Sequence, residues 1–271
     1  MANNLKLTTF NCTGCKSSES YIGNILCAKY HLIALQETWL LPHELARCDA
    51  IHPDFNRFAT SAVDTGGRVL RGRPYGGLAW LWHKTLDSKV KPVVYGENRI
   101  LGLRFNEGNS SILFLNVYMP TQTKENNLEF LRILGKIASI IEESSEDGVC
   151  LMGDWNANID TYYYKELMEL CVDKSLVMVD VDKLPCNSYT HVSEAHNSTS
   201  WLDHMILSKN ISIYVSKCEI LYGGASSNHF PLSCEINGIN NILNMTEIKS
   251  NGRAIQWKFD CTHGEGVYKR Y

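Results

Sequence analysis

Val149-Cys-Leu-Met-Gly-Asp-Trp-Asn156 is a short apolar run that ends in a carboxylate and a carboxamide. The run Val149–Asp154 has the length and composition of a buried strand. In layered α/β folds, sites assemble at strand ends because the scaffold is rigid there and the backbone turns. If the segment stays extended, Asp154 and Asn156 point to the same side. Taken alone, the pair is more typical of an Asx-turn.

Three other apolar runs end in polar residues in the same way. Asn11 follows Leu7–Phe10, Glu37 follows the run that begins at Leu32, and Tyr118 closes a third run. A carboxylate such as Glu37 at the end of a buried strand must be paired, neutral or bound to a cation. A cation site and a salt bridge or helix cap are equally compatible with this position.

The whole chain reads as a succession of strands with a few helices. Predicted strands cover Leu5–Asn11, Leu32–Gln36, Gly77–His83, Ile100–Phe105, Ile112–Tyr118, Val149–Asp154, Leu176–Val181, Trp201–Leu207, Ile213–Leu221 and Phe230–Ile236, and predicted helices cover Ser18–Tyr30, Asn126–Glu143 and Tyr162–Lys174. Ten strands exceed what one flat sheet holds comfortably, so we expect two packed sheets in an α/β or α+β layered fold. The pattern fades after Ile236. We therefore expect one folded domain over residues 1–236 and a tail or connector over 237–271.

Composition excludes several classes of protein. The chain has 271 residues, 44% of them hydrophobic, and a net charge of −3, which argues against a protein that coats nucleic acid non-specifically. No run reaches the roughly 18 apolar residues of a membrane helix, and the N-terminus lacks a secretory signal. We therefore expect an intracellular protein with reduced cysteines.

One basic stretch is either a solvated face or a phosphate-facing edge: Arg57, Arg68, Arg71, Arg73, Lys84, Lys89 and Lys91.

Two further segments carry polar residues of catalytic type. Ser200-Trp-Leu-Asp-His204 places Asp203 before an apolar run, and Ser226-Ser-Asn-His-Phe-Pro231 places His229 in a turn-rich loop. A carboxylate can hold an imidazole in one tautomer and stabilise its protonated form. The spacing does not bring the two together, and a loop histidine is more often simply exposed. The sequence has no P-loop, GxGxxG, GxSxG or HExxH motif, which excludes the corresponding enzyme classes.

Seven motifs in a fixed order are far more specific than any one of them: Phe10-Asn-Cys-Thr-Gly14, Leu35-Gln-Glu-Thr-Trp39, Gly72-Arg-Pro-Tyr-Gly-Gly77, Leu115-Asn-Val-Tyr-Met-Pro120, Leu151-Met-Gly-Asp-Trp-Asn156, Trp201-Leu-Asp-His204 and Ser227-Asn-His-Phe-Pro231. The series resembles the endonuclease/exonuclease/phosphatase superfamily, which includes abasic-site endonucleases, DNase I and sphingomyelinases. The match runs from about Leu5 to Ile236. Within the superfamily, the residues of these motifs look most like those of the endonuclease domain of LINE-type (non-LTR) retrotransposons.

The resemblance implies a DNase I-like fold and a metal site. The fold would be a four-layer α/β sandwich, with two mixed sheets packed face to face between helices. Glu37 would be the main Mg²⁺ ligand with Asn11 beside it, and Mn²⁺ would substitute. Asn228 stands where the family usually has Asp, and its carbonyl oxygen would reach the metal without adding charge. We therefore expect weaker metal affinity. Thr13, where repair members carry Asp, is a lesser departure.

The resemblance also implies a catalytic role for five residues. Asp154 would position or deprotonate the attacking water, and Asn156 would hold the phosphate. Tyr118 would bond the scissile phosphate or assist the leaving oxygen. His229, oriented by Asp203, would stabilise the pentacovalent phosphate or act as general acid/base. These are the parts that attack on a phosphodiester requires.

The implied function is Mg²⁺-dependent nicking of one strand of duplex DNA to leave a 3′-hydroxyl. Arg73, Tyr75 and Arg99 are expected contacts to the DNA backbone. The resemblance further implies a nuclear protein once fused to a reverse transcriptase, while its oligomeric state and target sequence stay open. One alternative is a phosphoesterase of the same fold that acts on inositol phosphates or sphingolipid head groups. Another, which Asn228 motivates, is a weakened or co-opted domain that binds DNA or a protein without cutting.

Overall fold

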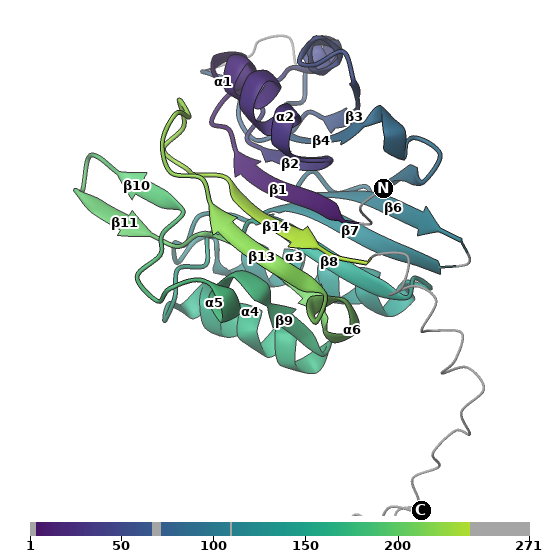
Figure 1. Ribbon diagram of the computed structural model, residues 1–271. Coiled ribbons are helices and arrows are strands. Elements are labelled where there is room, and N and C mark those ends of the chain that lie inside the picture. Colours follow the sequence, from purple (N-terminus) through teal and green to yellow (C-terminus); the bar gives the residue numbers. More distant parts are fainter. Residues whose placement is uncertain (1–3, 67–71, 109, 239–271) are drawn as a thin grey trace, which may run out of the picture.

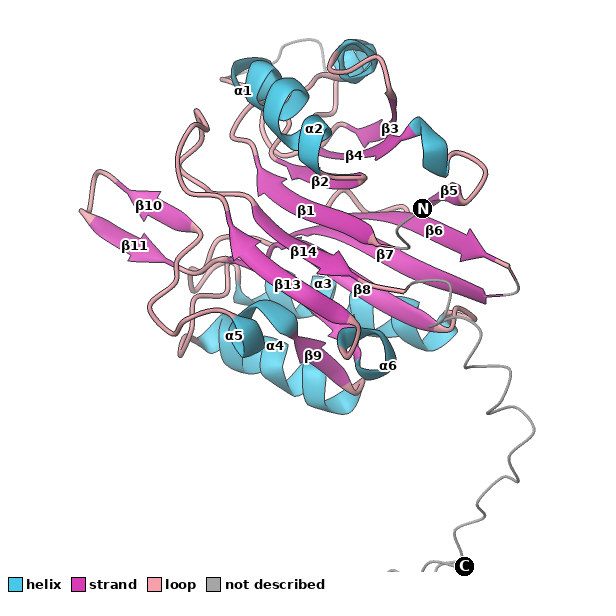
Figure 2. Ribbon diagram, in the orientation of Figure 1, coloured by secondary structure: helices cyan, strands magenta, loops and turns pink. Residues whose placement is uncertain are grey.

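Two six-stranded sheets form the centre of the molecule, and helices cover their outer faces (Figures 1 and 2). This computed structural model describes residues 4–66, 72–108 and 110–238. The arrangement confirms the expected DNase I-like sandwich of two mixed sheets flanked by helices. The predicted tail lies, from residue 239 onward, outside the described residues. No helix in the described part of the chain is long and apolar enough to cross a membrane.

Each sheet has one parallel strand pair at its centre. The first sheet has the order β13 (Val215–Ile220), β14 (Leu232–Ile236), β1 (Leu5–Asn11), β2 (Leu32–Gln36), β4 (Leu78–His83) and β3 (Phe55–Thr60). The second has the order β5 (Val90–Val94), β6 (Ile100–Glu107), β7 (Ser110–Tyr118), β8 (Gly148–Asp154), β12 (Asp203–Ser208) and β9 (Leu176–Met178). The pairs β1–β2 and β7–β8 are parallel, and the other neighbours are antiparallel.

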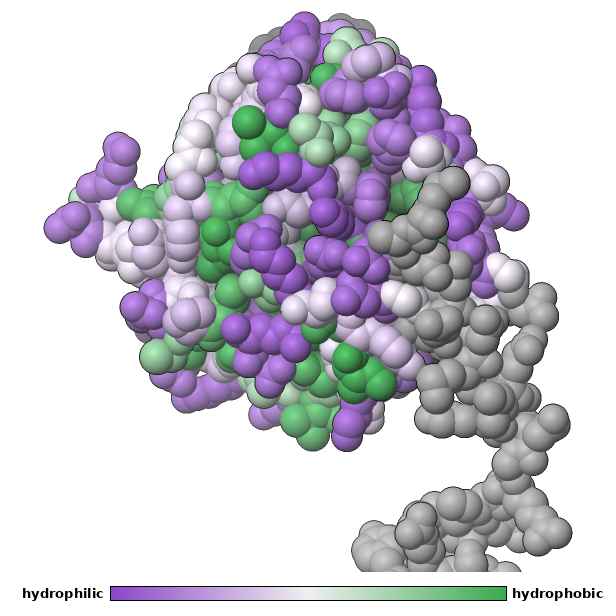
Figure 3. Space-filling view, viewed as in Figure 1, coloured by the Kyte–Doolittle hydropathy of each residue, from purple (hydrophilic) through white to green (hydrophobic). Residues whose placement is uncertain are grey.

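Helical segments cover the two outer faces. Over the first sheet lie α1 (Cys15–Tyr21), the π-helical η1 (Ile22–Leu26), α2 (Cys27–Lys29) and the 3₁₀-helical η2 (Pro42–Ala50). Over the second lie α3 (Asn127–Glu143) and α4 (Tyr162–Asp173), with the short α5 (Val179–Lys183) and α6 (Lys209–Ser212) at its edge; η3 (Lys84–Leu86) follows β4. A small hairpin of β10 (His191–Ser193) and β11 (Ser198–Ser200) projects from the body and has a hydrophilic tip (Figure 3).

Hydrophobic side chains fill three layers. The central layer lies between the two sheets, where Trp80 and Phe105 each pack edge-on against Phe114, with ring centroids 6.5 and 6.3 Å apart. The other two layers lie between each sheet and its helices. Because strands of both sheets bury both faces, most of them read as continuous apolar runs. Such a scaffold is rigid where the strands end, and the polar residues singled out by the sequence lie at these ends.

Some predicted elements were wrong or incomplete. The strand predicted over Leu176–Val181 stops at Met178, and Val179 begins α5, because Asp180 accepts hydrogen bonds from Trp201 and from the backbone of β12. The strand predicted from Trp201 begins at Asp203, because the backbone N–H groups of Trp201 and Leu202 donate to side chains, those of Asn158 and Thr190. Elements that the sequence did not predict are short or polar: β3, β5, β10, β11, η2, η3 and α6. The first predicted helix starts earlier, at Cys15, and contains the π-helical turn.

Candidate active site

The carboxyl ends of the two parallel strand pairs meet at one edge of the sandwich. Asn11, the last residue of β1, donates from Nδ2 to Glu37 Oε1 at 3.0 Å and to Asp154 Oδ2 at 2.9 Å. Tyr118, the last residue of β7, donates its hydroxyl to the same oxygen of Glu37 at 2.9 Å. Four predicted residues from both sheets therefore form one hydrogen-bonded network.

The turns that carry this network adopt an unusual backbone conformation. Four non-glycine residues here have left-handed φ angles, namely Thr13 (45°), Glu37 (51°), Trp39 (54°) and Asn156 (49°). Such conformations cost of order 1–3 kcal/mol each and persist only where the surroundings impose them. Glu37 is further fixed by Trp39, whose indole Nε1 donates to Glu37 Oε2 at 3.1 Å. Both carboxylate oxygens of Glu37 are thus held in place.

Asp154 is the most deeply buried carboxylate of the network. The Asx-turn that its sequence favours is present, because Asn156 N donates to Asp154 Oδ1 at 3.0 Å. The Asn156 side chain donates to the carbonyl oxygen of Met119 at 2.9 Å, which fixes it beside the carboxylate. Burial raises the pKa of Asp154 to about 7; His229 opposes the rise and Asp203 adds to it. The segment therefore forms the Asx-turn and at the same time places Asp154 in the polar network.

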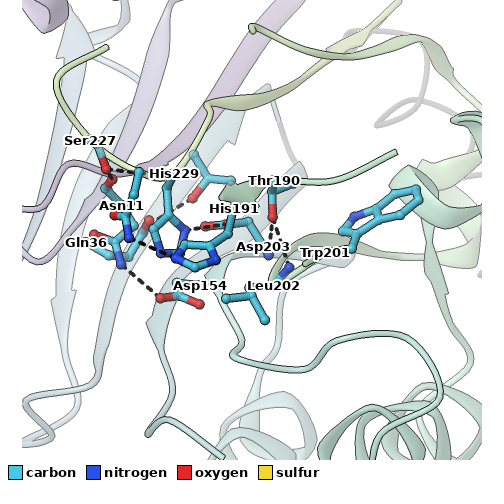
Figure 4. A network of polar contacts seen from close by, with 12 residues as sticks. Asn11, Gln36, Asp154, Thr190, His191, Trp201, Leu202, Asp203, Ser227 and His229 are labelled. Atoms are coloured by element: carbon cyan, nitrogen blue, oxygen red, sulfur yellow. Dashed lines mark hydrogen bonds and ion pairs between the residues drawn. The ribbon is translucent and has the colours of Figure 1, made fainter. Parts of the chain in front are cut away.

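His229 and Asp203 form a buried pair. Asp203 lies directly opposite Asp154 in the antiparallel register of β12 and β8. His229 Nδ1 lies 2.8 Å from Asp203 Oδ2 (Figure 4). Burial by itself lowers the pKa of His229, but the charge and hydrogen bond of Asp203, together with Asp154 and Glu37, outweigh it and raise this pKa to about 9. The imidazole is therefore a cation at neutral pH, and Nε2 is the nitrogen that Asp203 leaves available.

The sequence missed several residues that build this pair. The hydroxyl of Thr190 accepts from the backbone N–H groups of Leu202 and Asp203, at 2.9 and 3.0 Å, and so fixes the start of β12. His191 lies against His229, with ring centroids 4.7 Å apart. Both belong to the base of the β10–β11 hairpin, whose strands have three residues each. Strands this short leave no apolar period that sequence reasoning can detect.

The donor set fits a divalent cation. Asp154, Asp203 and His229 bring three possible ligand atoms within 4.8 Å of one another, which is a group of metal-site type among the described residues. Glu37 adds a third carboxylate, joined to Asp154 through Asn11. Converging carboxylates repel one another, and hard oxygen donors suit Mg²⁺. Asp203 is hydrogen-bonded to His229, whereas Asp154 is joined to Glu37 through Asn11.

The predicted DNA contacts lie at the rim of this network. The guanidinium of Arg73 stacks over the ring of Trp39 at 4.4 Å, next to Glu37. Arg99 stacks on Tyr118 at 5.3 Å and donates to the Tyr118 carbonyl oxygen at 3.1 Å. Tyr75 is 62% exposed. Elsewhere in the basic stretch, Arg57 and Lys89 form ion pairs with Asp49 and Glu107, and Arg68 and Arg71 lie outside the described residues.

Residues 9–231 match the model of the Endonuclease/Exonuclease/phosphatase family. The chain belongs to this family. No curated protein sequence matches the chain. Membership of the family, together with the buried Asp/His group, makes the protein a phosphodiesterase or nuclease. The expectation drawn from the seven ordered motifs is thereby confirmed at the level of the family.

Solved structures of similar fold include endonucleases and a phosphatase bound to DNA. The AP endonuclease LMAP from Leishmania major has a TM-score of 0.70 at 16% identity, covering 87% of this chain and 88% of that one. A 3′ phosphatase from Neisseria bound to product DNA hairpin has 0.66 at 14%, covering 86% and 99%. The endonuclease domain of TRAS1, a telomere-specific non-LTR retrotransposon, has 0.65 at 13%, covering 86% and 98%. At these identities the likeness shows the fold, and it favours no single relative.

Proposed function

We propose that this protein is a Mg²⁺-dependent endonuclease that nicks one strand of duplex DNA and leaves a 3′-hydroxyl. The observation that carries the proposal is the His229–Asp203 pair facing Asp154, in one network with Glu37. A carboxyl group whose pKa is raised toward neutrality and a cationic imidazole are the two proton-transfer groups that hydrolysis of a phosphodiester uses. The family also contains phosphatases that share this fold. The new part of the proposal is therefore the choice of DNA as the substrate.

Each residue of the network has a part in this reaction. Asp154 orients the attacking water and takes its proton, for which a pKa near 7 is suited. The cationic His229 faces the phosphate through Nε2 and stabilises charge that develops on its oxygens. Asn156 and Tyr118 hold the phosphate, the one from the Asp154 turn and the other from the end of β7. A Mg²⁺ ion bound by Glu37, with Asn11 beside it, would supply a Lewis acid for the phosphoryl oxygens.

The choice of DNA as the substrate rests on the arginine residues at the rim of the site and on the residues of two sequence motifs. Arg73 and Arg99 lie on aromatic rings beside Glu37 and Tyr118, where a phosphate backbone would pass. Gln36-Glu-Thr-Trp39 and Trp201-Leu-Asp-His204 look most like retrotransposon endonucleases. We extend the proposal accordingly to nicking of a target in the nucleus, by a domain of the kind that precedes a reverse transcriptase.

A comparison of substrates tests the proposal. Duplex oligonucleotides labelled at the 5′ end would be incubated with the protein and Mg²⁺, and the products extended with a DNA polymerase to detect a 3′-hydroxyl. In parallel, inorganic phosphate and phosphocholine release would be measured from inositol phosphates and sphingomyelin. We expect extendable nicked DNA and no release. Release from the small substrates without DNA cleavage would overturn the choice of DNA in favour of the phosphoesterase.

A further inference from the structure

Asn228 lies between two polar side chains at the edge of the site. As placed, its Oδ1 is 3.3 Å from Thr13 Oγ1 and its Nδ2 is 2.8 Å from His191 Nε2. The residue is exposed, directly precedes His229, and occupies the position where the resemblance implies Asp. A 180° rotation of the carboxamide exchanges its oxygen and its nitrogen, so the hydrogen-bond network decides which of them faces Thr13.

The number of hydroxyl protons in this network determines the orientation of the Asn228 carboxamide. The hydroxyl of Ser227 lies 2.7 Å from the carbonyl oxygen of Asn11, which can only accept, so the single Ser227 proton goes there. The hydroxyls of Thr13 and Ser227 are also hydrogen-bonded to each other, so Thr13 must be the donor of that pair. Thr13 then has no proton left for Asn228. It accepts instead, and the amide nitrogen of Asn228 faces Thr13.

The contact of the carboxamide with His191 supports the same orientation. If the oxygen of Asn228 faces His191, then His191 Nε2 carries the proton and Nδ1 is bare. Nδ1 is buried and has no hydrogen-bond partner, among the described residues. The opposite orientation would put the proton on Nδ1 and bury an unpaired N–H donor, which is a costlier arrangement than an unpaired acceptor.

His191 is itself held firmly enough to act as a partner. The backbone N–H of Val192 donates to the Asn228 carbonyl oxygen at 2.9 Å, and Phe230 N donates to the Thr190 carbonyl oxygen at 2.7 Å. These bonds and the His191–His229 bridge join the base of the hairpin to the loop that carries His229 (Figure 4). The position of the His191 ring is thus determined by the same segment that it contacts.

We propose that Asn228 presents an amide N–H group to a phosphate oxygen of the bound DNA, and that His191 is the positioning residue that holds it in this orientation. The proposal rests on the proposed function and assigns Asn228 a role other than that of the metal ligand predicted from the sequence. The amide nitrogen carries two hydrogens, and Thr13 takes one. The second is available at the exposed edge of the network, next to His229, where the phosphate would lie.

The tautomer of His191 gives the first test, in the free protein without DNA. Long-range ¹H–¹⁵N correlation spectra of the full chain at pH 8 in EDTA distinguish the two neutral tautomers, and the His191→Gln variant assigns the signal. We expect Nε2 to be protonated and Nδ1 to be bare. Protonation at Nδ1 would reverse the chain of hydrogen bonds and overturn the proposal, whether or not the protein cuts DNA.

Binding of duplex DNA in EDTA gives the second test. We expect Asn228→Ala and His191→Phe to raise the Kd about 5- to 10-fold, the loss of one hydrogen bond to a charged group. His191→Gln, which keeps a side-chain N–H donor, should restore binding, and His196→Phe at the hairpin tip should leave it unchanged. An unchanged Kd in Asn228→Ala with a higher Mg²⁺ requirement for nicking would contradict the donor role alone. Wild-type protein that binds DNA but never cuts it would contradict the proposed function alone.

Discussion

At the scale of single residues, the site depends on two groups whose pKa values both lie above their ordinary range. Burial holds the proton on Asp154 up to about pH 7, and the carboxylates around His229 hold its proton up to about pH 9. Between these values, Asp154 is able to take a proton while His229 is still charged. The division of roles therefore follows from the surroundings of each group and not from its type.

The raised pKa of His229 predicts how stability changes with pH. In the folded protein the pKa is about 9, against 6.5 in an unperturbed histidine, so the native state binds this proton more tightly. The resulting stability is fully present below pH 6.5 and is lost as the pH rises through 9. In EDTA, we expect the free energy of unfolding in urea to fall by on the order of 3 kcal/mol between pH 6.5 and 9.5. Asp154 acts in the same direction at lower pH, between 3.8 and 7.

The control for this prediction is His229→Gln. Glutamine has no titrating group but keeps a donor toward Asp203. The variant should lose most of the pH dependence between 6.5 and 9.5 while still folding at pH 6.5. Equal slopes in the wild type and the variant would show that other groups are responsible.

At the scale of elements, the two parallel strands β7 and β8 depend on one glycine for their close approach. Gly153 has a φ of 155°, and a Cβ added there would lie 1.9 Å from the carbonyl oxygen of Val117. Backbone cannot move aside as a flexible side chain does. We expect Gly153→Ala to destabilise the protein by about 3 kcal/mol or more, measured by urea unfolding, and to displace Asp154.

Gly135 offers the matched substitution. It lies within α3, and a Cβ added there meets nothing within 4 Å. Gly135→Ala should therefore stabilise the protein by roughly 0.5–1 kcal/mol, since alanine loses less entropy on forming a helix. If Gly153→Ala were tolerated as well as Gly135→Ala, the close packing of β7 against β8 would not be required.

The long strands and helices could be predicted from the sequence. The errors fall where an element depends on residues distant in the chain. The strands β1 and β2 have the predicted bounds, because an apolar run flanked by polar residues defines a buried strand on its own. In contrast, Val179–Val181 alternates like a strand but begins α5, where Asp180 accepts hydrogen bonds from His204 and Trp201. Those partners come more than 20 residues later in the chain, and no local pattern reveals them.

At the scale of the whole molecule, a polar bridge joins the two sheets just below the site. Asn116 in β7 is fully buried and donates to the carbonyl oxygens of Leu35 and Ala79, both at 3.0 Å. It also accepts from Gln36 Nε2 at 2.7 Å. Gln36 is the residue before Glu37. The bridge therefore fixes the distance between the two sheets at the point where Asn11 and Glu37 meet Asp154.

Removal of the bridge should cost stability and activity together. Asn116→Ala removes three buried hydrogen bonds, two to backbone carbonyl oxygens and one from Gln36 Nε2, which keeps only Thr9 Oγ1 as its acceptor, and we expect a loss of about 3 kcal/mol in urea unfolding. Asn24→Ala, on the exposed face of η1, should change stability by less than about 0.5 kcal/mol. Similar values for the two variants would mean that water replaces Asn116, and that the bridge does not determine the spacing of the sheets.

The candidate site was accessible from the sequence only in part. Asn11, Tyr118 and Asp154 end predicted strands and Glu37 follows one, which indicated that they lie where sites assemble in layered α/β folds. The pairing of His229 with Asp203 was implied by the resemblance alone, since 25 residues of loop, strand and helix separate them. Thr190 and His191 could not be found, because the register of a three-residue hairpin depends on tertiary contacts.

The central claim is that His229, held by Asp203 and facing Asp154, serves hydrolysis of a DNA phosphodiester. Conversion of supercoiled plasmid to open circle tests it most directly, with Mg²⁺ and with EDTA, for the wild type, His229→Ala and the exposed control His43→Ala. We predict nicking that requires Mg²⁺, persists in His43→Ala and falls by about 10²- to 10⁴-fold in His229→Ala. A folded wild type that never nicks DNA, even with Mn²⁺, or a His229→Ala variant that nicks at the wild-type rate, would contradict the claim.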